Sequence, residues 1–108
     1  MNILKETYLD HIYYENGRKA LVLVKKKDRQ PFSVLSINLP HHPLEEDEIA
    51  IKTWSENDWV LEFLLENEIV FPPHRCIPNG FVVVPICRLP PGELDKWPNA
   101  DHRTFDFV

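Results

Sequence analysis

The dipeptide Asn16-Gly17 constrains the fold more than any other feature, because it lies between two runs of strand-forming residues. Residues 7–14 precede it and residues 19–24 follow it, and both runs are rich in aromatic and branched side chains. An Asn-Gly pair in this context is typical of a two-residue type I′ turn, whose two central residues both need a positive φ. The chain is therefore expected to begin with an antiparallel hairpin.

A two-residue turn also predicts the register of this hairpin, with Tyr13 opposite Ala20 and His11 opposite Val22. Alternate side chains along a strand share one face of the sheet. The face expected to pack on the core carries Leu9, Tyr13, Ala20, Val22 and Val24.

Hydrophobic patterning predicts further strands over residues 31–39, 48–53 and 81–88, and a helix over about 56–67. Pro85 lies inside the last of these strands, which favours an edge position or a bulge there. The expected fold is α+β: an antiparallel sheet of four to five strands with the one main helix packed on one face. Residues 1–89 form this single domain, and the Pro-rich and aromatic tail over residues 90–108 is expected to pack back or bind a partner.

The start of the predicted helix has the pattern of a capping box. Ser55 is expected to be the N-cap and Asp58 to close the box three residues later. Trp54 and Trp59 then occupy the two positions of a hydrophobic staple. Asn67 is expected to end the helix in a left-handed conformation. These assignments explain Ser55 and the two tryptophans without any catalytic role.

Charge is distributed unevenly along the chain, whose net charge is −5. Residues 1–40 contain seven Lys/Arg and four Asp/Glu, for +3, whereas residues 41–70 contain one and nine, for −8. A block this acidic disfavours direct binding to nucleic acid and favours a partner protein with a basic surface.

Within the acidic block, Asp58, Glu62 and Glu66 stand four residues apart on one face of the predicted helix. Their spacing of about 6 Å along the helix axis is close to that of phosphates along a nucleic-acid strand. The hypothesis is that these carboxylates, with Glu45, Glu46 and Asp47 on the same surface, imitate nucleic-acid phosphates and bind a basic groove. The alternative is an ordinary solvated face of an acidic protein.

A second hypothesis is a small metal-binding protein or hydrolase that uses His41, His42, His74 and Cys76. Zinc is conceivable on His42, His74, Cys76 and Cys87, although none of the paired spacings of zinc motifs is present. Cys76 beside His74 and Arg75 is a conceivable nucleophile, but nothing in the sequence supplies a base or an oxyanion hole. We therefore predict no catalytic residue, no cofactor and no metal.

The sequence also indicates the cellular compartment of the protein. The longest apolar runs fall short of the ~20 residues that a membrane helix needs, and residues 1–10 do not resemble a signal peptide. The chain is expected to be cytoplasmic, with both cysteines reduced, and to be a monomer or a weak homodimer. A third hypothesis is a structural module that associates with itself through an exposed sheet edge.

Five segments stand in a characteristic order, over residues 15–18, 36–40, 48–57, 61–70 and 80–89. Together they resemble a small bacterial family of unknown function carried by plasmids, phages and other mobile elements. The likeness covers about residues 12–89 and is sharpest at Asn38-Leu39-Pro40 and over residues 51–57. The family tends to have a small residue near Glu68, where this chain departs from it.

The family has no established catalytic residues, and the resemblance implies an accessory protein of a mobile element. Our hypothesis is that this protein is non-enzymatic and blocks host machinery, as an anti-CRISPR or antirestriction inhibitor of a defence nuclease does.

Overall fold

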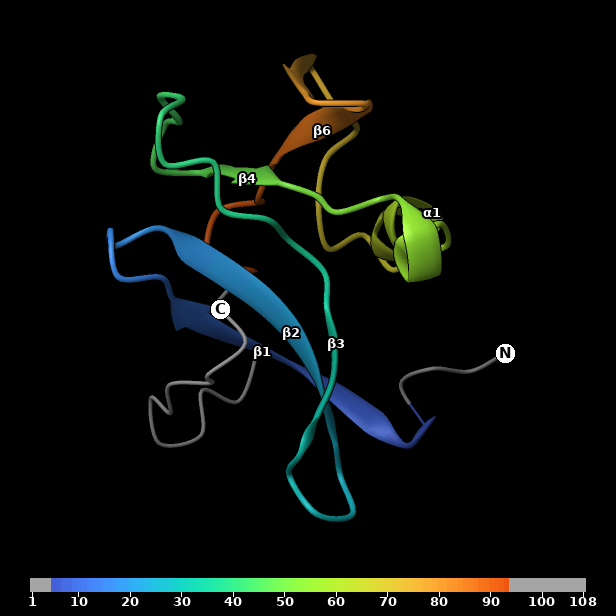
Figure 1. Cartoon of the computed structure of the whole chain (residues 1–108). Coiled ribbons are helices and arrows are strands. Elements are labelled where there is room, and N and C mark those ends of the chain that lie inside the picture. The colour runs from blue at the N-terminus through green and yellow to red at the C-terminus, as the bar shows by residue number, and fades with distance from the viewer. Residues whose placement is uncertain (1–4, 94–108) are drawn as a thin grey trace.

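The computed structural model describes residues 5–93 and confirms the α+β class (Figure 1). Of the tail over residues 90–108, which was expected to pack back or bind a partner, residues 94–108 lie outside the described residues. Within residues 5–93 no helix is long and apolar enough to span a membrane. The elements are β1 (Thr7–Tyr13), β2 (Lys19–Lys25), β3 (Pro31–Val34), β4 (Glu48–Ala50), the 3₁₀-helix η2 (Ser55–Asn57), α1 (Val60–Glu66), β5 (Arg75–Asn79) and β6 (Val82–Arg88).

The strands form two antiparallel sheets of three strands, ordered β1-β2-β3 and β4-β6-β5, instead of one sheet of four to five. Residues 35–37 lie between the two sheets and are hydrogen-bonded to both. The Leu35 N–H donates to the Leu21 carbonyl of β2 at 2.8 Å, while the Leu35 carbonyl accepts from Lys52 N–H at 2.9 Å. Ile37 N–H donates to the carbonyl of Ala50 in β4 at 3.0 Å. In place of the predicted single sheet there are therefore two sheets, which residues 35–37 join at a bend.

The bend encloses a central core, to which both sheets and the helix contribute buried side chains. We define the central core as Leu9, Leu21, Leu23, Leu35, Ile49, Ile51, Val60, Phe63, Leu64, Ile69, Val70, Cys87 and Leu89. Sheet residues Leu21, Leu35 and Ile51 are fully buried there, and Val60 and Leu64 of α1 pack against them. Burial of each such side chain stabilises the fold by about 1.5–3 kcal/mol. The outer faces of the two sheets carry smaller clusters of their own. The helix thus covers the concave side of the bent sheet.

The β1–β2 hairpin forms, but its predicted register and core face are wrong by one residue. Tyr13 pairs with Lys19, not Ala20. The loop has three residues, because Gly17 N–H donates to the Tyr14 carbonyl at 2.9 Å and Tyr14 N–H donates to Arg18 at 2.8 Å. Gly17 alone of the loop has a positive φ, 84°, which is the geometry of a type I turn with a G1 bulge.

The shifted register changes which side chains share a face. Leu9 joins Leu21 and Leu23 in the central core, whereas Ala20, Val22 and Val24 pack on the opposite face of the sheet. Tyr13, predicted to be a core residue, is half exposed.

Pro85 lies in β6, which is the central strand of its sheet, so the predicted edge position is wrong. Its carbonyl accepts a hydrogen bond from Ile51 N–H at 3.0 Å, on the side of β4. The nitrogen that lacks a hydrogen faces the same side. Because β4 ends at Ala50, opposite Ile86, the missing donor falls just beyond the end of that ladder. A central proline is tolerated there for this reason.

The predicted capping box and staple do not form. Ser55 begins η2 with a φ of 58°, and neither η2 nor α1 has a side-chain cap. Trp54 packs in the outer cluster of the second sheet, while Trp59 packs on the central core, so the two indoles serve different clusters. The α-helix begins at Val60 instead of Glu56.

Asn57 determines the position of this helix start. Its side chain is 1% exposed and its Nδ2 donates to the Val34 carbonyl at the end of β3, at 2.7 Å. Trp59 Nε1 donates to the Glu56 carbonyl at 2.8 Å. This partly buried hydrogen bond to a distant strand overrides the local capping pattern.

The helix ends in a Schellman motif with glutamate at its left-handed position. Glu68 has a φ of 55°, whereas Asn67, predicted to occupy that conformation, has a φ of −95°. Ile69 N–H donates to the Leu64 carbonyl at 2.9 Å and Glu68 N–H to the Leu65 carbonyl at 3.1 Å. Glycine is the usual residue at this position, because a Cβ is unfavourable there.

We expect Glu68→Gly to stabilise the protein by about 1 kcal/mol, because glycine relieves the left-handed backbone. Its midpoint of thermal unfolding should rise by about 4–8 °C. The matched control is Glu62→Gly, which makes the same change at a right-handed helical position and should lower stability by about 1 kcal/mol. A Glu68→Gly variant that is less stable than the wild type would contradict the assigned conformation.

Candidate functional site

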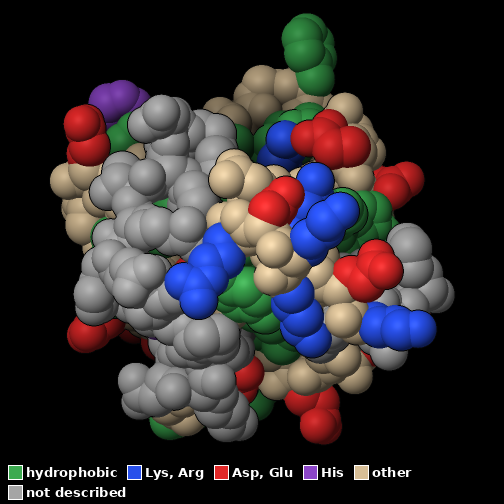
Figure 2. Space-filling view, turned by 90° about the horizontal axis from the view of Figure 1, so that it is seen from below, with side chains coloured by type: hydrophobic (Ala, Val, Ile, Leu, Met, Phe, Trp, Pro, Cys, Tyr) green, Lys and Arg blue, Asp and Glu red, His purple; other side chains and the backbone are tan. Residues whose placement is uncertain are grey.

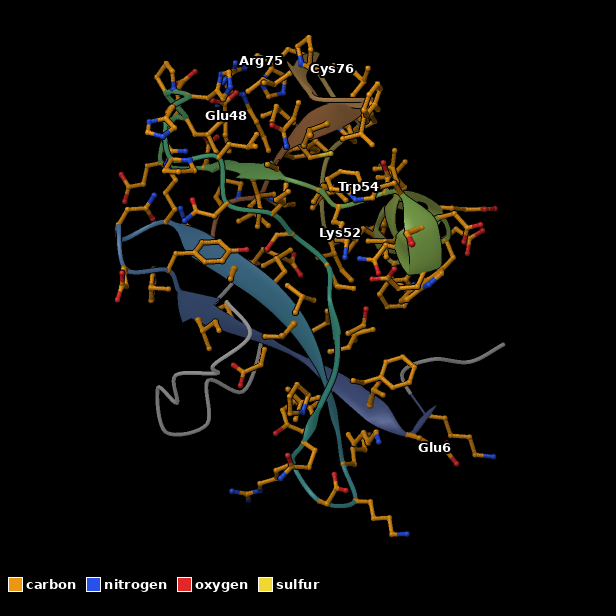
Figure 3. The ribbon with its side chains drawn as sticks, in the orientation of Figure 1. Glu6, Glu48, Lys52, Trp54, Arg75 and Cys76 are labelled. Atoms are coloured by element: carbon orange, nitrogen blue, oxygen red, sulfur yellow. The ribbon has the colours of Figure 1, made fainter. Side chains whose placement is uncertain are left out.

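The acidic loop before β4 ends at a buried carboxylate, Glu48, whose side chain is 1% exposed. Its Oε1 accepts from Arg75 Nη2 at 2.9 Å and from the backbone N–H of Glu45 at 2.8 Å. Its Oε2 accepts from Arg75 Nε at 3.0 Å and lies 2.5 Å from His74 Nε2. Figure 3 shows Arg75 and Glu48 together at this end of the second sheet. The carboxylate is thus held in a bidentate pair, the strongest kind of salt bridge.

Hydrogen bonds from Arg75 are the main reason why the pKa of Glu48 falls to about 2, although burial acts in the opposite direction. Arg75 Nη2 also donates to the Pro43 carbonyl at 3.0 Å. The loop is therefore fastened to the edge strand β5 through one buried carboxylate.

The carboxylates of Glu45 and Asp47 are paired as well. Arg88 of β6 donates to Asp47 Oδ1 at 2.6 Å and to Glu45 Oε1 at 2.8 Å. The Lys19 ammonium donates to the backbone carbonyl of Glu46. Two arginines outside the acidic block thus compensate the charge of this loop, so the loop is less negative than its sequence indicates.

The acidic residues predicted on the helix lie elsewhere. Glu62 and Glu66 are in α1, but Asp58 lies in the turn before it, because the helix begins at Val60. All three are exposed, and none of them forms an ion pair within residues 5–93. The loop before β4 and α1 lie at opposite ends of β4 (Figure 1). Glu45, Glu46 and Asp47 therefore do not form one continuous surface with the helix, contrary to our expectation. At the lower end of the molecule, Lys and Arg side chains lie among Asp and Glu (Figure 2).

The structure does not assemble His41, His42, His74 and Cys76 into one site. His74 is bound to Glu48, Cys76 is exposed on β5, and the carbonyl of His42 accepts from Arg18. Cys87, the fourth member of the conceivable zinc set, is buried in the central core. Among residues 5–93 no group of three or more His, Cys, Asp or Glu side chains is placed to hold a metal ion.

An exposed apolar end of the β5–β6 hairpin is a feature that the sequence reasoning missed. Phe81 in the turn is 109% exposed and Val83 is 59% exposed. Cys76 and Pro78 are also exposed, and they lie opposite Pro85 and Val83 in the ladder. The available signal was the absence of any charged residue over residues 76–87. We call Cys76, Pro78, Phe81 and Val83 the hairpin patch.

Comparison of the chain with protein-family models, with curated proteins and with solved structures finds no match. The resemblance to the mobile-element family remains a prediction from the sequence.

We expect Glu48→Gln to lower the free energy of unfolding at pH 7 by about 2–3 kcal/mol, because it breaks a buried ion pair. The pKa of Glu48 is lower in the folded than in the unfolded chain, so its contribution is complete above about pH 4.5 and is lost toward pH 2. Urea unfolding of both proteins between pH 7 and pH 3 should show their stabilities converging. The matched control, Glu45→Gln, alters an exposed pair and should cost less than about 1 kcal/mol. A constant difference across this pH range would contradict the buried pair.

The two thiols should differ in reactivity. Burial raises the pKa of the Cys87 thiol to about 12, whereas Cys76 is exposed. A thiol reagent at pH 8 should modify Cys76 alone in the folded protein and both thiols after unfolding in urea. Mass spectrometry of the labelled peptides measures this, and equal labelling of the two thiols in the folded protein would show that β6 is misplaced.

Proposed function

We propose that this chain is a non-enzymatic, cytoplasmic protein-binding protein of a mobile genetic element that inhibits a host defence nuclease. Its contact surface is an acidic face formed by Asp58, in the turn before α1, and by Glu62 and Glu66 of α1. The partner is a protein with a basic groove, in which these carboxylates take the place of nucleic-acid phosphates.

The observation that carries this proposal is the contrast between the two acidic groups. In the loop before β4, Glu45, Asp47 and Glu48 are paired with arginines. At the helix, Glu62 and Glu66 of α1 and Asp58 in the turn before it form no ion pair among the described residues. Like charges four residues apart on a helix cost a few tenths of a kcal/mol per pair. A partner with a basic groove would convert that repulsion into attraction.

The geometry offers less support for an enzyme. The buried carboxylate Glu48 is saturated by His74, Arg75 and the Glu45 amide, so it has no free oxygen to act as a base. The proposed histidines and Cys76 are not gathered around a common point. A binding surface needs only the exposed helix face.

The test is affinity capture from bacterial lysate, with the wild type and Glu62→Gln/Glu66→Gln as baits. We expect the wild type to retain a nucleic-acid-binding protein that duplex DNA displaces and that rising salt releases. The helix variant should retain at least ten times less of it.

The matched control is Glu6→Gln/Glu15→Gln, which removes the same charge from two exposed positions elsewhere and should retain the protein fully. Equal capture by the helix variant, or capture that duplex DNA does not reduce, would refute the phosphate-mimic role.

A further inference from the structure

The hairpin patch owes its shape to a tight turn. Asn79 pairs with Val82, so Gly80 and Phe81 form a two-residue connection, in which Gly80 has a φ of 64°. This is the turn geometry that matches the twist of a hairpin, and it requires glycine at that position. The phenyl ring is therefore held on a rigid projection in full contact with solvent, at 109% exposure.

The two faces of the hairpin differ. On one face, Ile77 and Val84 are buried in the outer cluster of the second sheet, together with Leu39 and Ile86. On the other, Pro85 and Cys87 are covered near the base of the hairpin but Val83 remains 59% exposed. The charged residues nearest in sequence, Arg75 and Arg88, are engaged with Glu48, Glu45 and Asp47. The patch is thus apolar and without free charge.

A shallow cavity of about 290 Å³, largely open to solvent, lies beside the edge strand β3. Its walls are Pro31, Phe32, Ser33 and Val34 on one side and the ion-paired Lys52 and Glu56 on the other, 2.8 Å apart. Phe32 is half exposed there. A cavity of about 150 Å³ suffices for a benzene ring. Two other cavities, of about 510 and 140 Å³, are lined by charged side chains of the 45–48 loop and suit a phenyl ring less well.

We propose that Phe81 of one copy inserts into this cavity of a second copy. The phenyl ring would lie against Phe32, in an aromatic pair, and beneath the ammonium of Lys52, in a cation–π contact. The hairpin end and β3 lie in opposite halves of the molecule (Figure 1), so Phe81 cannot fill the cavity of its own chain. Figure 3 shows Lys52 on the segment that leads from β4 toward α1, beside this cavity.

The contact is head-to-tail, because the two partners contribute different surfaces. Such a contact leaves one free hairpin and one free cavity on every dimer, so association continues beyond the dimer, into rings or open chains. The contact involves few residues and is therefore weak, with a dissociation constant on the order of 1 mM. Since each copy carries a net charge of −5, salt should strengthen the association by screening the repulsion. This inference goes beyond the proposed function and does not depend on it, because binding through the acidic helix should weaken with salt.

The test is sedimentation of the wild type from 10 µM to 1 mM protein at low and high salt, with NMR chemical shifts over the same range. We expect the mean mass to rise with concentration, more steeply in high salt. Chemical shifts should move at residues 31–34, 52 and 81–83.

Two variants, Phe81→Ser and Phe32→Ser, remove the projection and the cavity wall respectively, and each should be monomeric alone. Mixed in equal amounts, they should form a 1:1 complex that does not grow, because the intact Phe81 of one fits the intact cavity of the other. Phe71→Ser, which removes another half-exposed phenylalanine, should associate like the wild type.

A wild type that remains monomeric at 1 mM, with unchanged chemical shifts, overturns the proposal. So does loss of association in Phe81→Ser but not in Phe32→Ser, which would indicate a symmetric contact between hairpins. A mixture of the two variants that forms no complex also overturns it. The shifts of the wild type keep the proposal testable if either variant fails to fold.

Discussion

The backbone of residues 35–37 is the constraint on which the rest of the structure depends, because it is hydrogen-bonded on both sides. On one side it pairs with β2, and on the other with β4 and Lys52. Leu35 projects from this segment into the central core and is fully buried. The segment joins two three-stranded sheets into one bent structure whose concave side accepts α1.

Much of this could be predicted from the sequence, because hydrophobic patterning reports burial. The α+β class, the β1–β2 hairpin and the approximate location of every strand except β5 (Arg75–Asn79) follow from it. The failures share one cause, which is that a distant or backbone partner overrides a local rule. Asn57 binds the end of β3, so Ser55 does not cap the helix. A third loop residue shifts the hairpin register, and the end of β4 lets Pro85 sit in a central strand.

The candidate site was harder to predict, because the sequence does not show which charged side chains form ion pairs with each other in the folded protein. Glu45, Asp47 and Glu48 look as negative as Asp58, Glu62 and Glu66, yet Arg75 and Arg88 pair with the first group from 27 to 43 residues away and compensate most of its charge. Only the tertiary pairing separates the two groups. The exposed Phe81 was missed because an apolar strand is normally buried on both faces. Here the end of the β5–β6 hairpin extends beyond the residues that bury its base, so Phe81 remains exposed.

Amide hydrogen exchange under native conditions tests the joining of the two sheets most directly. If residues 35–37 unite them, the amides of Leu35, Ile37 and Lys52 should exchange only through global unfolding. Their opening free energies should then equal those of buried amides in β2 and in β6. Opening of Ile37 and Lys52 at a clearly lower free energy than β2 would contradict this, since the two sheets would then unfold as separate units.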